Sequence, residues 1–315
     1  MTITQLKYVL AVAEYKNFTL AAEKCFVTQP TLSMQIQKIE DELSILIFDR
    51  TKKPIQLTDI GQKIVNQAKN IVNEADRIQD IVEQQKGFVG GEFRLGIIPT
   101  IMPTLLPMFL NTFIKKYPKV KLIIEELNTE DIILKLNNGH LDAAIAATPL
   151  QEENIKEIVL YFEPFMAYIP EGHRDYPKKE IEVADLDLNE ILLLQDGHCF
   201  RDGILNLCKN NPKKEFSHFQ IESGSFETLV KLANEGLGTT LLPYLHTLDL
   251  KESDKLKLRH FKEPKPAREV SLLFAKSELK IHIIDALRTT IAGIIKGAIV
   301  FQNIEIISPL AKNKK

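Results

Sequence analysis

The sequence has little of several features that would assign a protein to a class at once. Its 315 residues contain three cysteines and no tryptophan, and 40 basic residues nearly balance 42 acidic ones, giving a formal net charge of -2. So few cysteines, odd in number, exclude a secreted disulfide framework and favour a reducing, cytoplasmic setting. The balanced charge gives no sign of a nucleic-acid partner, although a small basic surface can exist within a neutral chain.

Long apolar runs are also missing, since no stretch approaches the roughly 18 residues of a membrane span. The N-terminus lacks a basic start followed by an apolar core, and Glu14 interrupts the apolar residues of the first helical pattern. We therefore expect neither a signal peptide nor a membrane partner. No Cys/His pair has zinc-ligand spacing and no phosphate-binding glycine pattern occurs, so we expect no metal and no cofactor. With 44% apolar and 26% charged residues, the composition is that of a globular protein of two domains or more.

The first sixty residues predict three helices. Apolar residues recur at helical spacing from Leu6 to Ala13, and a second helix is expected over 20–24 with Thr19 as its cap. Thr28 is a good N-cap for a third helix, and Pro30 lies in its first turn, where a missing N–H costs nothing. The third helix carries one apolar stripe, made of Leu32, Ile36, Ile39 and Leu43.

The other side of this third helix is polar, with Ser33, Met34 and Gln37 after Gln29 and Thr31 at its start. Short amide and hydroxyl side chains in the first turns suit reading of the DNA major groove. An ordinary helical hairpin with a solvated polar face is the alternative that periodicity leaves open. Charge does not separate the two, because the seven cations of residues 1–62 are matched by seven anions. The next segment, 48–58, gathers three cations and then alternates like a strand, which predicts a wing placed against phosphates.

Several motifs of this region resemble the winged helix-turn-helix of LysR-type transcriptional regulators. They are Ala21-Ala22, Thr28-Gln29-Pro30-Thr31-Leu32-Ser33, Ile39-Glu40, Leu43, Phe48-Asp49-Arg50 and Leu57-Thr58 with Gly61. The resemblance implies double-stranded promoter DNA as a partner, and RNA polymerase as a further one. It places Gln29, Pro30, Thr31, Ser33 and Gln37 at bases or nearby phosphates, and Arg50 in the wing.

A helix of nearly thirty residues is expected from the Thr58 cap to about Gln85. Its apolar positions recur in steps of three and four, from Ile60 through Ala68 and Ile78 to Val82. So long and narrowly striped a helix implies a partner helix; packing against its own chain is the alternative. The resemblance likewise implies pairing through this linker helix and assembly as a homotetramer.

From Glu92 the pattern changes to alternating strands and helices, which predicts an α/β domain with a covered sheet. Strands are expected at 93–98, 120–125, 143–146, 164–169, 191–194, 219–222, 239–242 and 270–274. Helices are expected at 105–116, 130–137, from about 200, and after Ser225 and His282.

The resemblance implies a domain like the periplasmic binding proteins, with two subdomains joined by crossing strands. The expected divisions are 1–58 for DNA binding, 59–87 for the linker helix, 88–91 as a hinge, and 92–310 for the effector domain. Its subdomains would comprise 92–162 with 268–300, and 163–267.

Two of the three cysteines, Cys199 and Cys208, flank a short predicted helix. Nine residues of α-helix separate two positions by roughly 13 Å and turn them to opposite sides. A disulfide needs its Cα atoms within about 7 Å. If these thiols ever join, the helix between them must come apart, so oxidation would choose between two states.

Cys199 follows Gly197-His198 at a predicted helix start, with Arg201 two residues on. The helix dipole and the nearby cation are expected to favour its thiolate form. Inert burial is the alternative for both thiols, more so for Cys208, and Cys25 is expected to be a structural thiol.

The motif Gly197-His198-Cys199-Phe200-Arg201-Asp202, with Cys208 nine residues after the first cysteine, resembles the peroxide-sensing members of the same family. The resemblance implies that Cys199 reacts with hydrogen peroxide, that Cys208 resolves the product to a disulfide, and that Thr100, Thr129 and His198 bind the peroxide. The supporting residues would be Arg201, Asp202, His218 and Arg268. Two positions, Gln220 and Ala267, depart from the family pattern and leave the charge around Cys199 open.

These patterns together indicate a DNA-binding regulator, not an enzyme, that senses hydrogen peroxide. A regulator of the same family that answers a small-molecule effector, with inert cysteines, is the first alternative. A thiol peroxidase carrying a helix-turn-helix is disfavoured by the missing Cys-x-x-Cys motif. A solute-binding protein does not explain the N-terminal domain.

Overall fold

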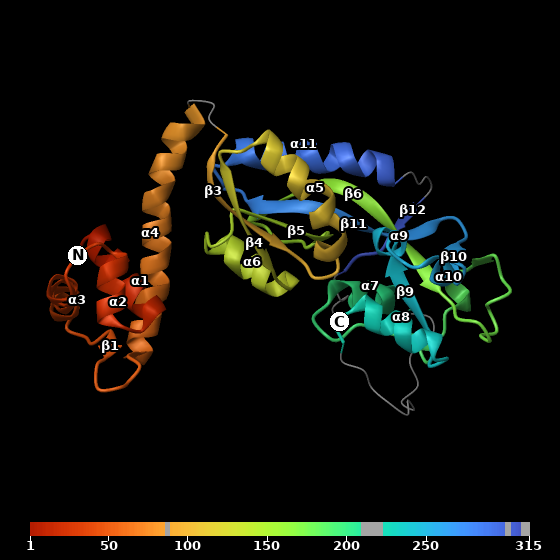
Figure 1. The fold of residues 1–315 in the computed structure, drawn as a ribbon, viewed down its shortest axis with the longest axis horizontal. Coiled ribbons are helices and arrows are strands. Elements are labelled where there is room, and N and C mark those ends of the chain that lie inside the picture. Colours follow the sequence, from red (N-terminus) through yellow and green to blue (C-terminus); the bar gives the residue numbers. More distant parts are fainter. Residues whose placement is uncertain (86–88, 209–222, 300–303, 310–315) are drawn as a thin grey trace. The chain divides into compact units, whose positions relative to one another are not determined.

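The computed structural model describes residues 1–85, 89–208, 223–299 and 304–309. The chain divides into two compact units, Met1–Phe88 and Val89–Lys315 (Figure 1). Each unit has its own hydrophobic core or cores.

The N-terminal unit consists of helices and a small hairpin. These elements are α1 (Ile3–Tyr15), α2 (Phe18–Lys24), α3 (Gln29–Leu43), β1 (Phe48–Asp49), β2 (Gln56–Leu57) and α4 (Asp59–Gln85). The predicted cap of α3 is confirmed, because Thr28 Oγ1 accepts a hydrogen bond from the Thr31 N–H. The cap predicted at Thr19 is wrong. Asn17 caps α2 instead, because its amide oxygen accepts from the N–H groups of both Thr19 and Leu20.

One face of each of the first three helices forms the core of this unit. The fully buried side chains are Leu6, Val9, Val12, Ala21, Ala22, Leu32, Ile36 and Ile39. Leu43, which the sequence pattern places on the same stripe, is 38% exposed. It lies in the last turn of α3, and the chain turns away at Ser44, whose φ is 56°. The periodic pattern therefore overestimates burial by one turn.

Helix α4 packs against α1 over its first half, where Val65, Ala68 and Val72 are buried. Of the predicted stripe, Ala68 is buried by its own chain, which was the alternative to a partner helix, whereas Ile60 is 43% exposed. Ile78 lies further along the helix and is 65% exposed. A large apolar side chain left in water at that point is available to a partner.

The C-terminal unit is built on one mixed sheet. Its strands are β3 (Gly91–Ile97), β4 (Val120–Glu126), β5 (Ala143–Thr148), β6 (Ile155–Tyr168), β7 (Glu180–Ile181), β8 (Ile191–Leu192), β9 (Thr239–Pro243), β10 (Leu258–Phe261), β11 (Lys265–Ala275) and β12 (Ile304–Ile306). The order is β4-β3-β5-β11-β6-β10-β7, with β12 beside β11, and β9 between β6 and β8. Strands β3, β4 and β5 are parallel, whereas β11 runs antiparallel to both β5 and β6.

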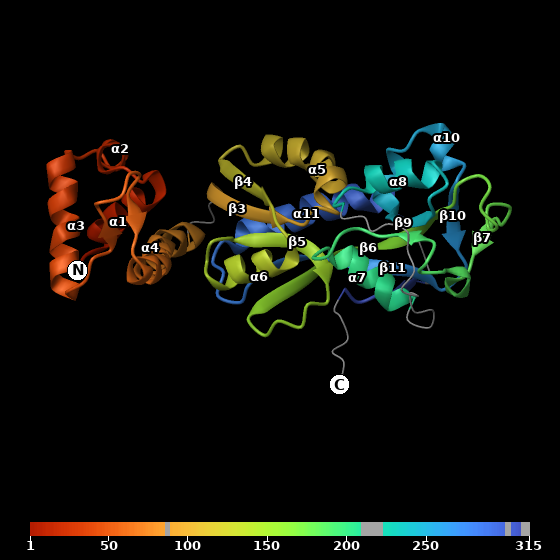
Figure 2. The same cartoon turned by 90° about the horizontal axis from the view of Figure 1, so that it is seen from below.

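Helices cover both faces of this sheet. They are α5 (Met102–Lys116), α6 (Thr129–Asn137), α7 (Cys199–Leu207), α8 (Phe226–Asn234), α9 (Tyr244–Leu248), α10 (Glu252–Lys255) and α11 (Ile281–Ala298), with a 3-10 turn at Val183–Asp185. Helices α5 and α11 pack together over one face of the first half of the sheet, and α6 lies on the other face (Figures 1 and 2). This arrangement follows from the βαβ connections, because α5 leads outward from β3 to β4 and α6 leads back to β5.

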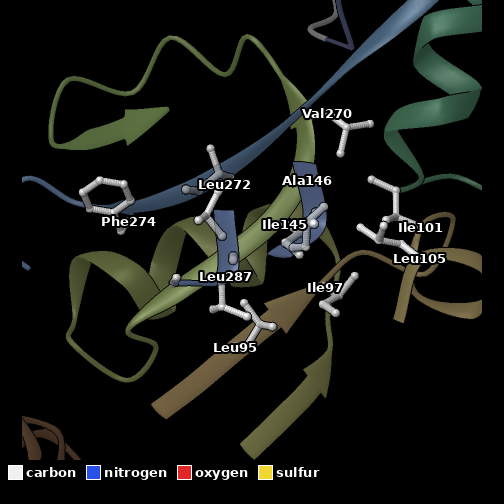
Figure 3. Close-up of a cluster of buried hydrophobic side chains, with 14 of the residues drawn as sticks. Leu95, Ile97, Ile101, Leu105, Ile145, Ala146, Val270, Leu272, Phe274 and Leu287 are labelled. Atoms are coloured by element: carbon white, nitrogen blue, oxygen red, sulfur yellow. The ribbon is translucent and has the colours of Figure 1, made fainter. Parts of the chain in front are cut away.

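Two hydrophobic cores divide this unit. The first is centred on Leu95 and Ile97 of β3, Ile145 of β5, Leu272 of β11 and Leu287 of α11 (Figure 3). The second gathers side chains from the remaining strands and helices, and its largest members are Phe165, Tyr168, Phe200, Phe226 and Phe261. Strand β6 contributes to both cores, so it carries the chain from one subdomain to the other.

Strand β6 begins at Ile155, so the prediction of a strand from Pro164 is wrong by nine residues. Glu163 and Pro164 interrupt the apolar pattern and hide the continuity of the strand. The structure tolerates the charge because Arg268 lies opposite Glu163 on β11. Strands β7, β10 and β12 were not predicted, and the strand predicted at 219–222 lies outside the described residues.

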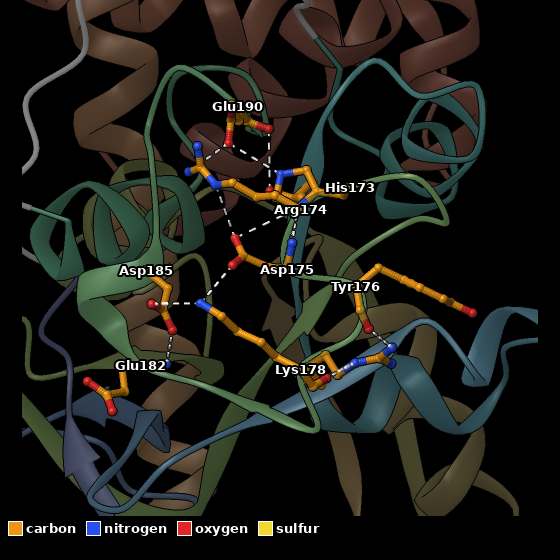
Figure 4. A network of polar contacts seen from close by, with 10 residues as sticks. His173, Arg174, Asp175, Tyr176, Lys178, Glu182, Asp185 and Glu190 are labelled. Atoms are coloured by element: carbon orange, nitrogen blue, oxygen red, sulfur yellow. Dashed lines mark hydrogen bonds and ion pairs between the residues drawn. The ribbon is translucent and has the colours of Figure 1, made fainter.

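Ion pairs hold the long connection between β6 and β8 (Figure 4). Lys178 bridges Asp175 and Asp185 with N–O distances of 2.7 and 3.0 Å, and Arg174 reaches Glu190 at 3.0 Å. Within the described ranges, no group of three or more His, Cys, Asp or Glu side chains is arranged to hold a metal ion.

None of the helices within the described ranges has both the length and the apolar character needed to cross a membrane.

Candidate redox site and nucleic-acid interface

The redox candidate Cys199 is the first residue of α7, and His198 is the N-cap. Gly197 precedes them with a φ of 87°, a left-handed conformation that favours glycine and turns the chain into the helix. The Cys199 side chain is buried in the first core, whereas its neighbour Phe200 belongs to the second. The start of α7 therefore lies where the two subdomains meet.

Burial is the largest influence on the Cys199 thiol and raises its pKa. The Arg268 guanidinium and the Thr129 hydroxyl act in the opposite direction, and the Asp202 carboxylate adds to the rise. The expectation of a resting thiolate is therefore wrong, because desolvation outweighs the favourable charges.

Arg201 is not the cation that acts on this thiol. Its Nε lies 2.8 Å from Asp196 Oδ1, and its Nη1 donates to the Leu194 carbonyl at 3.0 Å. These contacts tie the loop before α7 to the first turn of the helix. The cation near Cys199 is Arg268, which comes from a distant part of the chain.

Arg268 is buried and holds Thr100 in place. Its Nη1 donates to Thr100 Oγ1 at 2.8 Å, and its Nη2 donates to the Thr100 carbonyl at 3.0 Å. Because the oxygen of the Thr100 hydroxyl accepts from Arg268, the hydrogen of that hydroxyl is left to donate elsewhere.

Among the residues that the structure describes, the buried hydroxyls of Thr129 and Tyr161 have no hydrogen-bond partner. Thr129 lies at the start of α6 and is close enough to Cys199 to favour its thiolate form. A buried hydroxyl without a partner is costly, so the lack of one at these two positions needs an explanation. Burial lowers the pKa of His198, so at neutral pH its imidazole is uncharged and can either donate or accept.

Cys208 is at the opposite end of α7, as its C-cap. Its thiol is buried in the second core, and burial raises its pKa to about 11. Both Cys199 and Cys208 are free thiols. Nine helical residues place them about 13 Å apart along the axis, and each points into a different core. The prediction that the intact helix separates them is confirmed.

His218 and Gln220 lie outside the described residues. Ala267 and Arg268 are both buried on β11. The sequence interpretation missed Glu163, which is 1% exposed and pairs with Arg268. A single acidic residue within the apolar run from Val159 to Phe165 was the available signal, because a buried charge needs a partner. Cys25, expected to be a buried structural thiol, is only partly buried at the end of α2.

The exposed side of α3 carries most of the predicted DNA-binding residues. The side chains of Gln29, Pro30, Thr31 and Gln37 are exposed, and Ser33 is partly so. Arg50 of the hairpin is more constrained than a mobile wing residue would be. Its Nη2 lies 2.8 Å from the buried Glu40 carboxylate, and its guanidinium stacks on Phe18.

A helix-turn-helix with a hairpin wing, joined by a long helix to a two-core α/β domain, defines a DNA-binding regulator with a sensing domain. Residues 3–62 match the family model described as the bacterial regulatory helix-turn-helix protein of the lysR family. Residues 86–293 match the family model of the LysR substrate binding domain. The chain belongs to the LysR family. The fold class and family predicted from the sequence are thereby confirmed.

Three relatives illustrate the similarity. A hydrogen peroxide-inducible genes activator of Pectobacterium carotovorum is 34% identical over 274 residues, which are 87% of this chain and 90% of that protein. The full-length structure of a cysteine-to-aspartate variant of OxyR from Pseudomonas aeruginosa is 34% identical, with a TM-score of 0.73 and coverage of 93% of this chain and 98% of that one. The peroxide-bound structure of a cysteine-to-serine variant of Corynebacterium glutamicum OxyR is 27% identical, with a TM-score of 0.63 and coverage of 94% and 93%.

Proposed function

We propose that this chain is a transcription regulator that responds to hydrogen peroxide through a disulfide between Cys199 and Cys208. The observation that carries the proposal is the pairing of a buried thiol with an unpartnered Thr129 hydroxyl, beside a Thr100 hydroxyl held by Arg268. The two hydroxyl groups can donate hydrogen bonds, and the Thr129 oxygen can also accept one, so together they suit a small molecule with two oxygens. The relatives named for hydrogen peroxide support the same assignment.

The first step consumes one peroxide at Cys199. The sulfur attacks one peroxide oxygen, the O–O bond breaks, and the thiol proton goes to the departing oxygen, so that thiol and peroxide become sulfenic acid and water. Thr100, Thr129 and the neutral His198 would hold the two oxygens and assist the proton transfer. Since the resting thiol is protonated, this transfer is part of the reaction at neutral pH.

The second step joins the sulfurs. The Cys208 thiol attacks the sulfenic sulfur of Cys199, and the disulfide forms with loss of water. This step requires α7 to unfold, because its two ends lie in different cores. Unfolding removes Phe200 and Ile204 from the second core. The subdomains then repack, and the spacing of recognition helices along DNA changes.

The regulator is proposed to act as a homodimer through α4 and as a homotetramer on promoter DNA, with RNA polymerase as a further partner. The exposed Ile78 supports the α4 contact. Gln29, Pro30, Thr31, Ser33 and Gln37 are proposed to face bases or nearby phosphates, and Arg50 to support the wing. The chain is proposed to act as a regulator and not as a peroxidase, with no cofactor.

The Cys199→Ser variant tests the proposal. DNA footprints of the wild-type protein are expected to change after peroxide treatment, and those of the variant are expected to stay in the reduced pattern. Cys25→Ser is the matched control, because that thiol lies in the other unit, and it should respond as the wild type does. A Cys199→Ser protein that still responds to peroxide contradicts the proposal.

A LysR-family regulator that binds a small-molecule effector, with inert cysteines, is the competing function. The burial and raised pKa values of both thiols are the observations in its favour. Titration of free thiols before and after mild peroxide separates the two functions. The sensor loses two thiols per chain, whereas the effector-binding regulator loses none.

A further inference from the structure

Glu163 is a buried carboxylate that faces Arg268 across the strands joining the two subdomains. The two residues are register partners on β6 and β11, and their side chains are 1% and 3% exposed. Glu163 Oε2 accepts from both Nε and Nη2 of Arg268, at 2.9 and 2.7 Å. Its Oε1 accepts from the Leu245 N–H at the start of α9, at 2.8 Å.

The remaining contacts of Arg268 lead to the redox site. Besides the two hydrogen bonds to Thr100, its guanidinium lies over the ring of Phe200, with 5.2 Å between Cζ and the ring centroid. Phe200 directly follows Cys199 in α7. One carboxylate therefore fixes a guanidinium that touches both a proposed peroxide ligand and the residue next to the reacting thiol.

The charge of Glu163 matters as much as its position. A guanidinium alone in a dry interior would strongly favour a thiolate nearby. A carboxylate in direct contact cancels most of that effect, because a paired charge acts on its surroundings as a dipole. Burial is the largest influence on the pKa of Cys199 and raises it, whereas the nearby Arg268 lowers it. Pairing with Glu163 would limit how far Arg268 can oppose the effect of burial.

We propose that Glu163 is a positioning residue for Cys199, which holds Arg268 against Thr100 and Phe200 and offsets the charge of Arg268, so that the buried thiol stays protonated at rest. A role of Glu163 in peroxide sensing rests on the proposed function. Its effect on the ionisation of Cys199 does not depend on that function. While its thiol is protonated, Cys199 would react slowly with electrophiles other than a small molecule that the site holds.

Other titratable groups surround the site. At Cys199, burial raises the pKa of Asp202 and lowers that of His198. At the Glu163–Arg268 pair, burial raises the pKa of Tyr161 and lowers that of His246. These groups are the same in every variant compared, so a difference between two pH profiles is assigned to the substituted residue.

The test is the alkylation rate of Cys199 against pH in the full chain, with Cys25→Ser and Cys208→Ser so that a single thiol remains. Adding Glu163→Gln keeps the shape and hydrogen bonding of the side chain but removes its charge. The inflection should move to lower pH, and the rate at pH 7 should rise about tenfold, the change that one pKa unit produces.

Two further variants make the result specific. Glu269→Gln removes a carboxylate on β11, one residue after Arg268, that accepts a hydrogen bond from Thr148, and it should leave the profile unchanged. Glu163→Gln with Arg268→Gln removes both charges, avoids an unpaired buried guanidinium, and should return the profile to within about twofold of the parent. The proposal is overturned if the profile of Glu163→Gln is unchanged. It is also overturned if the double variant shifts as much as Glu163→Gln alone.

Iodoacetamide is the probe, so the experiment contains no peroxide. If the Glu163→Gln profile shifts while peroxide fails to oxidise Cys199, the proposed function fails and the role of Glu163 stands. If peroxide oxidises Cys199 and the profile does not shift, only the role of Glu163 fails.

Discussion

At the scale of single residues, the two thiols of α7 are kept protonated mainly by burial. At Cys199 the nearby cation partly opposes this effect of burial on the pKa, whereas at Cys208 burial alone raises the pKa. A buried thiol attacks slowly, because the thiolate is the nucleophile. Unfolding of α7 would expose Cys208 and return its pKa towards the ordinary value, so the helix also controls when the second thiol becomes reactive.

The pKa of Cys208 predicts an alkaline loss of stability. Below its ordinary pKa of 9.0 the thiol is protonated in both the folded and unfolded chain, and its contribution does not vary with pH. Between pH 9 and about 11 the unfolded chain releases this proton while the folded chain keeps it, so stability falls as pH rises. In reducing buffer the wild type should lose up to about 2 kcal/mol more than Cys208→Ala across this range.

Chemical denaturation followed by circular dichroism at several pH values measures this difference, with Cys25→Ala as the control. Lysines and tyrosines titrate in the same range in every variant, so only the difference between proteins is informative. Parallel curves for wild type and Cys208→Ala would show that burial does not shift this thiol.

At the scale of elements, the short strand β12 pairs with β11 next to Arg268, and the residues that follow it contact α7. Ile307 N–H donates to the Ala267 carbonyl at 2.8 Å, and the Asn206 side chain of α7 donates to the Ser308 carbonyl at 2.9 Å. Ile307 packs on the second core. These contacts depend on the folded form of α7, so they stabilise the reduced state.

Ile307→Ala should therefore shift the thiol–disulfide equilibrium towards the disulfide. A partly buried isoleucine truncated to alanine loses about 1 kcal/mol, which corresponds to roughly fivefold in the equilibrium constant. Mass spectrometry of thiols trapped in glutathione buffers of graded potential measures it. Ile306→Ala is the matched control, because that side chain is 45% exposed on the same strand. An equal shift in both variants would argue against the contact with α7.

At the scale of the whole molecule, helix α4 lies between the helix-turn-helix and the sensing domain along the chain. Helix α4 packs Val65, Ala68 and Val72 into its own unit and leaves Ile78 in water. A dimer contact along α4 would explain why so large an apolar side chain stays exposed. The same contact would let a change in the sensing domains alter the spacing of two recognition helices.

Ile78→Asp should shift the protein from dimer to monomer, because a buried unpaired carboxylate in a helix pair costs several kcal/mol. Sedimentation equilibrium across a dilution series measures the shift, which is expected to raise the dissociation constant at least about a hundredfold. Ile114→Asp, at a 48% exposed position of α5, is the control. An unchanged assembly in Ile78→Asp would place the dimer contact elsewhere.

The sequence by itself determined the features that depend on near neighbours in the chain. Thr28 and the stripe of Leu32, Ile36 and Ile39 define the recognition helix, and the helix between Cys199 and Cys208 separates the two thiols. Caps and helical periodicity act within about four residues, so they can be read directly.

Tertiary structure alone decided the environment of Cys199. Arg268 and Glu163 lie 105 residues apart in the chain, and only the register of β6 against β11 brings them together. Arg201, close to Cys199 in sequence, is instead bound by Asp196 and the Leu194 carbonyl. The pKa of a buried group depends on every charge and on the amount of protein packed around it, and that surrounding is assembled by folding from segments that no local pattern connects.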